Sequence, residues 1–203
     1  HHTSHSTSSD TGSDIERARL RPGIRASASH ASPFSATPTE TMAAGGMSTL
    51  TIEAGVVMRF DYGSANIWRI GLGSSNGSLA SNIWPVRLIA NGTASEPIVL
   101  TSAEGSPPAG DWGGIRWGGG PPAGNVMNHV RIEYAGGFSG TTGFGCGPGN
   151  NDAALIITSW RPDEAFIPDS TFSDSAGGGI VSGWHSDEPG PNLLGNNTFT
   201  NIA

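Results

Sequence analysis

Apolar and polar residues alternate in short blocks along most of the chain. In the block 49–60, apolar side chains recur at every second position on either side of a central Ala-Gly pair, which predicts two short strands joined by a bend. Further short blocks of this kind cover 86–90, 97–101, 114–117, 130–134, 154–158 and 179–182. Because turn-forming residues separate the blocks, the sequence predicts an all-β fold built from many short strands.

A six-residue segment outside these blocks recurs in similar form later in the chain. The hexapeptide Asp-Ser-Thr-Phe-Ser-Asp (169–174) is followed 27 residues later by Asn-Asn-Thr-Phe-Thr-Asn (196–201). A repeat of about 20–50 residues is typical of solenoids, in which each coil of the chain stacks on the previous one. The two-residue hairpin turns of an antiparallel sandwich are mostly missing. The echo therefore predicts that Phe172 stacks on Phe199, with the last polar residue of each hexapeptide at a turn.

The first 48 residues differ from the rest of the chain. They are rich in Ser, Thr and Ala and have almost no apolar periodicity, which is typical of a linker or a disordered tail. Within them, Ser13 and Glu16 fit a capping box, which predicts a helix of about two turns over 14–21. We therefore expect a flexible or capping N-terminal extension over 1–48 and one folded domain over 49–203.

Composition and charge narrow the classes of protein that remain. Gly (31) and Pro (14) together make up about a fifth of the 203 residues, which excludes long helices. All ten cationic residues are Arg, against 17 Asp and Glu, and the formal net charge is -7. Because this charge repels phosphate groups, we expect no nucleic-acid partner. No apolar run approaches the roughly 18 residues of a membrane-spanning helix, so we also expect no membrane span.

The chain has a single cysteine, Cys146, which excludes a disulfide within the chain. It lies in the glycine-rich segment 143–149. Three interpretations stay open: an inert thiol, a thiol whose partner lies beyond the last residue, and a reactive nucleophile.

Four phrases follow one another in the first part of the folded domain. They are Leu-Thr-Ile-Glu-Ala-Gly-Val-Val-Met-Arg-Phe (50–60), Leu-Ile-Ala-Asn-Gly-Thr-Ala-Ser-Glu-Pro-Ile-Val-Leu-Thr-Ser (88–102), Gly-Asp-Trp-Gly-Gly-Ile-Arg-Trp (110–117) and Asn-His-Val-Arg-Ile-Glu-Tyr-Ala-Gly-Gly (128–137). In this order they resemble the right-handed parallel β-helix repeat proteins of bacterial cell surfaces. The resemblance implies a right-handed parallel β-helix, with a mostly irregular N-terminal extension.

In that family the phrases form scaffold, and the residue types agree with this role. Trp112 is expected to cover a corner of a coil beside Asp111, where the following two glycines allow close approach of the backbone. His129 and Glu133 alternate with apolar neighbours, so we expect them on the solvent face, with membership of a functional site as the alternative.

The ends of a parallel β-helix expose unpaired strand edges and therefore need caps. The helix expected over 14–21 is the candidate cap at the first end. The last three residues, 201–203, directly follow a strand-like block. The domain is therefore either truncated at its C-terminal end, as part of a longer protein, or completed when two molecules pair as a homo-oligomer through their open ends.

Fold alone does not settle function, because β-helices include polysaccharide lyases, glycosidases, adhesins and passive surface proteins. A glycosidase needs two carboxyl groups about 5 Å or 6.5–9.5 Å apart. Acidic residues gather late in the chain, at Asp152, Asp163, Glu164, Asp169, Asp174, Asp187 and Glu188. Our candidate catalytic residues are Asp174, Asp187, Glu188 and His185, and our candidate substrate-binding residues are Trp160, Arg161 and Trp184. A solvated acidic face, with Trp side chains that cover corners, is the alternative interpretation.

A uronate lyase would need an arginine as base, together with cations that neutralise the carboxylate of the substrate. The arginines available in the folded domain are Arg59, Arg69, Arg87, Arg116, Arg131 and Arg161. Calcium is the candidate cofactor, because the net charge of -7 otherwise opposes an anionic polymer. Paired Cys and His residues with the spacing of a metal site are absent from the sequence.

The sequence therefore predicts a secreted or cell-surface module that binds a polysaccharide or cell-wall glycan, or that serves as an extracellular scaffold. The alternative is a polysaccharide hydrolase or lyase that uses carboxylates in a groove on the β-helix. An enzyme would place two carboxylates, or an arginine opposite a carboxylate, around one concave groove. A passive module would scatter these residues over convex turns.

Overall fold

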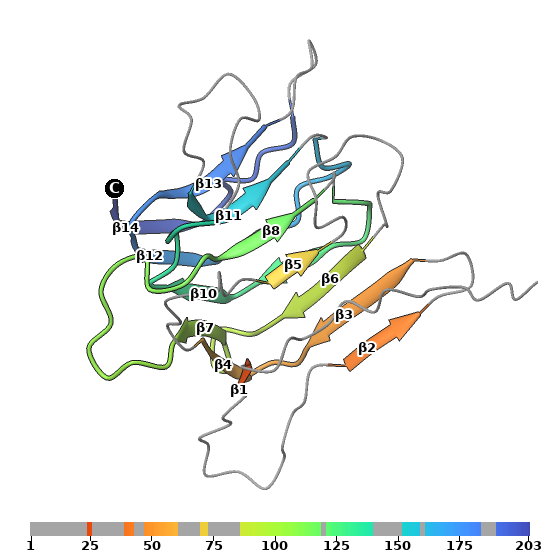
Figure 1. Cartoon of the computed structure of the whole chain (residues 1–203). Coiled ribbons are helices and arrows are strands. Elements are labelled where there is room, and N and C mark those ends of the chain that lie inside the picture. Colours follow the sequence, from red (N-terminus) through yellow and green to blue (C-terminus); the bar gives the residue numbers. More distant parts are fainter. Residues whose placement is uncertain are drawn as a thin grey trace, which may run out of the picture.

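A computed structural model describes residues 24–25, 39–42, 47–60, 70–72, 86–118, 121–139, 152–158, 161–183 and 190–203. The regular secondary structure of these residues is entirely β-strand (Figure 1). Among them, no helix offers the length and hydrophobicity that a membrane crossing requires.

The strands form three sheets. In spatial order, sheet A contains β1 (Ile24–Arg25), β4 (Val57–Phe60), β7 (Ile98–Ser102), β10 (Val130–Glu133), β12 (Thr171–Ser175) and β14 (Thr198–Ile202). Sheet B contains β2 (Thr39–Met42), β3 (Ser48–Ile52), β6 (Val86–Asn91) and β9 (Val126–Asn128). Sheet C contains β13 (Gly178–Ser182), β11 (Ala153–Ile157), β8 (Ile115–Trp117) and β5 (Ile70–Leu72).

The chain passes through the sheets in a repeating order of B, A and C. Strands β3, β4 and β5 form one pass, and β6, β7 and β8 form the next, followed by β9, β10 and β11. Strands of successive passes pair in parallel in all three sheets. Because parallel neighbours cannot be joined by a tight hairpin, each pass must leave a sheet before the chain returns to it. The fold is thus all-β, with parallel strands in three stacked sheets.

The strand register stacks side chains of successive passes inside the fold. One column on sheet A consists of Met58, Leu100, Ile132, Phe172 and Phe199. The first four of these side chains are buried, and the phenyl rings of the last two stack with centroids 5.0 Å apart and an interplanar angle of 10°. The stacking that the hexapeptide echo predicts is therefore confirmed.

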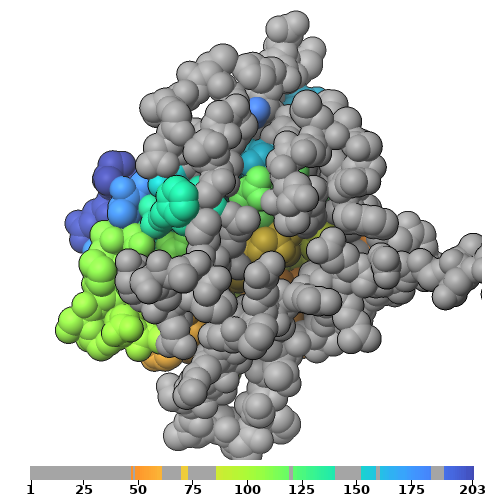
Figure 2. Space-filling view, in the orientation of Figure 1, coloured from red at the N-terminus to blue at the C-terminus, as the bar shows by residue number. Residues whose placement is uncertain are grey.

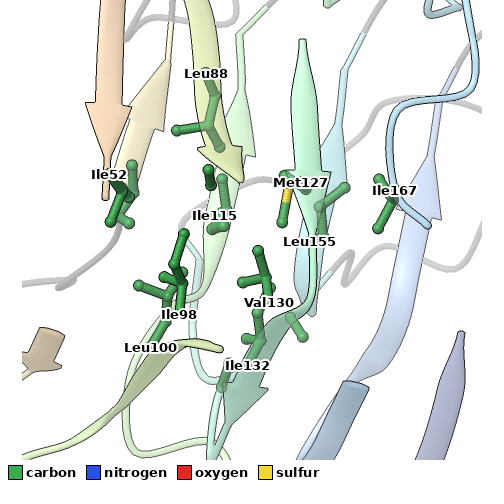
Figure 3. Close-up of a cluster of buried hydrophobic side chains, with 14 of the residues drawn as sticks. Ile52, Leu88, Ile98, Leu100, Ile115, Met127, Val130, Ile132, Leu155 and Ile167 are labelled. Carbon is green, nitrogen blue, oxygen red and sulfur yellow. The ribbon is translucent and has the colours of Figure 1, made fainter. Parts of the chain in front are cut away.

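The column belongs to one hydrophobic core that all three sheets enclose. Figure 3 shows Ile52 and Leu88 from sheet B, Ile98 from sheet A, and Ile115 and Leu155 from sheet C gathered around a common interior. Each of these side chains is at most 1% exposed. Burial of one such side chain contributes about 1.5–3 kcal/mol, so the three sheets stabilise one another through this core.

Polar residues with left-handed backbone conformation lie near the C-terminal ends of three strands of sheet A. Tyr134, Asp174 and Asn201 have φ angles of 60°, 54° and 52° and occupy equivalent places in three passes. Asn and Asp tolerate this conformation better than most residues do. The Nδ2 group of Asn201 donates to Oδ1 of Asp174 over 2.9 Å, so the two polar residues stack as the sequence predicts. They lie within β12 and β14, however, and not at a turn as expected.

Two strands of the N-terminal extension pair with the first pass. β1 pairs antiparallel with β4, and β2 pairs antiparallel with β3. These pairings satisfy backbone groups that the edge strands of sheets A and B would otherwise expose. The helix expected over 14–21 lies outside the described residues.

The corner between sheets A and C requires glycine where successive passes touch. A Cβ atom at Gly137 would meet the carbonyl oxygen of Gly110 in the preceding pass, and a Cβ atom at Gly177 would meet the carbonyl oxygen of Asp152. Backbone oxygens cannot move aside as flexible side chains do, so these positions limit how tightly the passes stack.

The substitution Gly137→Ala tests this close approach. We expect the free energy of unfolding to fall by about 1–3 kcal/mol, because the added methyl group overpacks the corner. The matched control is Gly71→Ala in β5, where no atom lies within 4 Å of the added Cβ, and this change should stay within about 0.5 kcal/mol of wild type. Urea denaturation followed by circular dichroism measures both values, and equal stabilities would contradict the close packing.

Candidate functional site

A groove with a volume of about 410 Å³ lies on the outer face of sheet A. Its lining comes from β4, β7 and β10 and from the segment 103–110, which connects β7 to β8. The lining residues are Val57, Arg59, Val99, Thr101, Ser102, Glu104, Gly105, Pro107, Arg131, Glu133 and Tyr134. The groove therefore combines an apolar strip with charged groups, hydroxyl groups and one aromatic ring.

Strand alternation and register bring these side chains together. In β4, Met58 points into the core, so its neighbours Val57 and Arg59 point outward. The parallel register places Val57 beside Val99, and Arg59 beside Thr101. The floor of the groove thus contains the apolar pair of Val57 and Val99, which Arg131 adjoins in the same row, next to the polar pair of Arg59 and Thr101.

The charged groups of the groove differ in their partners. Nη2 of Arg131 lies 2.6 Å from Oε1 of Glu133, and the Arg131 side chain is 53% exposed. An exposed pair of this kind contributes at most about 1 kcal/mol, so a ligand can displace it at little cost. Within the described residues, neither Arg59 nor Glu104 forms an ion pair. One guanidinium and one carboxylate therefore face the groove without a charged partner among the residues that the structure describes.

Two buried residues fix the ends of the strands that line the groove. Asp111 is 5% exposed and accepts a hydrogen bond of 2.5 Å from the hydroxyl of Ser102. Trp112 is 2% exposed, stacks on Phe60 with a centroid distance of 4.1 Å, and donates from Nε1 to the carbonyl of Glu133 over 2.8 Å. Both residues have the scaffold role that the sequence indicates.

The described residues of the predicted site lie apart from this groove. Asp174 is half-buried in β12 and accepts a hydrogen bond from the side-chain amide of Asn201. Arg161 is exposed in the segment before Phe166. Neither residue lines the groove on sheet A. The remaining candidates lie outside the described residues: Asp187, Glu188, His185, Trp160 and Trp184. Their roles stay predictions, and Cys146 also lies outside the described residues.

Three other late acidic residues hold backbone amides at corners. Oδ1 of Asp152 accepts from the amide of residue 139 over 2.7 Å, and Oδ2 of Asp163 accepts from that of residue 123 over 3.1 Å. Oε1 of Glu164 accepts from the amide of residue 124 over 2.5 Å. These contacts favour a structural role for all three carboxylates. In the described part of the chain, no group of three or more His, Cys, Asp or Glu side chains could hold a metal ion.

The groove residues did not stand out in the sequence. Arg59, Arg131, Glu133 and Tyr134 lie in the phrases 50–60 and 128–137, which the resemblance interprets as scaffold. Glu104 has no local motif around it. A usable signal is the long connection after β7, which contains Pro107 and adjoins the outward residues of three strands.

Comparisons of the chain with protein-family models, with curated proteins and with solved structures find no match. The geometry and chemistry of the groove are therefore what bears on the function of this protein.

The substitution Trp112→Phe separates ring stacking from hydrogen bonding at the base of the groove. The variant keeps an aromatic ring beside Phe60 but leaves the buried carbonyl of Glu133 without its donor. The matched control is Trp117→Phe, because Nε1 of Trp117 is buried without a hydrogen-bond partner. We expect Trp112→Phe to lower the free energy of unfolding by about 1–3 kcal/mol more than Trp117→Phe does. Urea denaturation measures the difference, and equal losses would show that the hydrogen bond is unimportant.

Proposed function

We propose that the three stacked sheets are those of a right-handed parallel β-helix, of the type found on bacterial cell surfaces. The repeating sheet order and the parallel pairing of successive passes support this proposal. The right hand follows from the general rule that crossovers between parallel strands of one sheet are almost always right-handed.

On this scaffold, we propose a secreted or cell-surface module that binds carbohydrate through the groove on sheet A. The observation that carries the proposal is that Arg59, Thr101, Glu104 and Tyr134 line one groove beside an apolar floor. A sugar ring has an apolar face and a polar rim, so it matches a site with both surfaces. An open groove along a sheet also admits a polymer from the side, whereas an enclosed cavity would admit only a small molecule.

The unpartnered groups of the groove suit sugar hydroxyl and carboxylate groups. A guanidinium offers several donors in one plane, and a carboxylate accepts two hydrogen bonds, so each group can hold neighbouring oxygens of a sugar. Neither Arg59 nor Glu104 has to break an ion pair with a described residue before it binds. Charged groups without an ion-pair partner among the described residues favour a polar ligand over a purely apolar one.

A binding panel tests this function. The probes are polygalacturonate, xylan, chitin oligosaccharides and peptidoglycan fragments, each titrated with and without calcium by isothermal calorimetry. We expect at least one probe to bind, and Arg59→Ala to weaken that binding about tenfold, because a charge-assisted hydrogen bond is lost.

The matched control for this panel is Arg87→Ala. Arg87 lies in β6 of sheet B and donates to the carbonyl of Ala123, away from the groove. Its substitution should leave the affinity unchanged. If no probe binds, carbohydrate binding is wrong and an extracellular scaffold becomes the better interpretation. If Arg87→Ala weakens binding as much as Arg59→Ala does, the groove is the wrong site.

A second candidate function is a polysaccharide hydrolase or lyase in the same groove. The specific observation is that two carboxylates, Glu104 and Glu133, line the groove together with Arg59. Two carboxylates and an arginine in one groove are the residue types that this chemistry uses, which supports the enzymatic alternative.

Substitution of the groove carboxylates tests the enzymatic alternative. Glu104→Gln and Glu133→Gln should each reduce the release of reducing ends or of unsaturated products by about a hundredfold or more, because proton transfer is lost. Asp174→Asn and Asp187→Asn, assayed in parallel, test the residues that the sequence predicts. If only Asp174→Asn and Asp187→Asn lose activity, the active site lies away from this groove. A wild-type protein without activity on the panel is not a polysaccharide-degrading enzyme of the kinds considered.

A further inference from the structure

The segment 103–110 is an exposed wall with buried ends. It joins β7 to β8 and bows away from sheet A, in lime green in Figure 1, and Figure 2 shows it on the molecular surface. Most of its residues are exposed, whereas Ser102 and Asp111 on either side of it are 2% and 5% exposed. Its residue Glu104 lines the groove. The position of this wall therefore depends on how its two ends are held.

One hydrogen-bond chain connects the two ends. The hydroxyl of Ser102 donates to Oδ2 of Asp111 over 2.5 Å and accepts from the backbone N–H of Glu104 over 2.9 Å. A serine hydroxyl has a single hydrogen. Because Asp111 receives this hydrogen, a lone pair of the oxygen is left to face the amide of Glu104. Asp111 thus orients the hydroxyl of Ser102 and, through it, the hydrogen bond that the amide of Glu104 donates, although Asp111 does not itself bond to that amide.

The far end of the wall is held by packing as well. Gly110 has a φ of 79°, and a Cβ atom there would lie 2.5 Å from the Cβ of Ala176. The next residues, Asp111 and Trp112, are buried beneath the groove. The wall therefore has little freedom at this end. At the other end, the bond from Glu104 to Ser102 acts beside the backbone bond that Ala103 donates to the carbonyl of Phe60 over 2.9 Å.

We infer that Asp111 is a positioning residue for the groove: through Ser102 it holds the segment 103–110 as a fixed wall and places Glu104 to select among glycan ligands. This inference rests on the proposed carbohydrate-binding function, which it deepens by naming the device that sets ligand choice. Asp111 does not line the groove, so it acts on the ligand only through the wall.

Amide hydrogen exchange measures the wall directly and needs no ligand. Within residues 103–109, the amides of Ala103 and Glu104 donate hydrogen bonds, to the carbonyl of Phe60 and to the hydroxyl of Ser102. We expect Asp111→Ala and Ser102→Ala each to speed exchange over this segment, at the amide of Glu104, about tenfold or more, because a charge-assisted hydrogen bond of the buried pair is lost. The double variant should exchange no faster than the faster single variant, since both changes break one chain of bonds. Asp111→Asn keeps an acceptor oxygen and Ser102→Thr keeps a hydroxyl, so each of these variants should retain most of the wild-type protection.

The matched control is Asp163→Ala, which removes another carboxylate that holds a backbone amide, at residue 123. It should leave exchange over 103–109 unchanged. We also compare the affinity for the best-bound glycan probe with that for the second-best. Asp111→Ala should lower the ratio of these two affinities about tenfold or more, whereas Asp163→Ala should leave the ratio unchanged.

Exchange over 103–109 at the wild-type rate in both Asp111→Ala and Ser102→Ala would overturn the inference, whatever happens to affinity. If exchange over 103–109 is faster but the affinity ratio is unchanged, the claim that the wall places Glu104 to select among glycans is overturned. A wild-type protein that binds none of the probes would instead overturn the proposed function, and the exchange rates would still decide whether Asp111 holds the wall. If Asp111→Ala fails to fold, Ser102→Ala tests the same bond from its other side.

Discussion

The parallel register between successive passes of the chain is the constraint on which the rest of the structure depends. It stacks Met58, Leu100 and Ile132 inside the fold and, with the same hydrogen bonds, aligns Val57 with Val99 outside it. Because side chains alternate along a strand, a slip of one residue would turn the buried column to solvent and the groove residues into the core. The core and the groove therefore both depend on the same strand register, and neither can form without the other.

Corners present a different physical problem, because the sheet ladders end there while the backbone stays buried. Polar side chains replace the missing partners. Asn125 accepts from the amide of Leu88 and donates to the carbonyl of Pro122, and Asn197 accepts from the amide of Ser170. This requirement explains why a chain with many short strands is rich in Asn and Ser. It also means that a polar residue at a corner is weak support for a ligand site.

Sequence alone predicted the strands and part of their stacking, because both leave local signals. Alternation located most of the blocks, and the echo of 27 residues found the Phe172 and Phe199 pair. The groove escaped prediction because equivalent positions recur at uneven intervals. Residues 57, 99, 131, 171 and 198 share one row of sheet A, so the spacing varies between 27 and 42 residues. Carboxylates that hold backbone amides, as Asp163 does, also look identical in sequence to carboxylates free for chemistry.

The uneven distribution of charge changes what the net charge implies about ligands. A formal charge of -7 argues against an anionic polymer if it acts as one field over the whole protein. At physiological ionic strength, however, exposed charges more than about 8 Å apart are largely screened from one another, so the local balance matters more. The groove contains two arginines and two glutamates, and is therefore neutral although the folded domain is acidic. Arg59 also lacks a charged partner among the described residues, which leaves the groove able to receive a neutral or an acidic sugar. Local charge balance in the groove, rather than the overall excess of acid, thus governs which glycans this surface can accept.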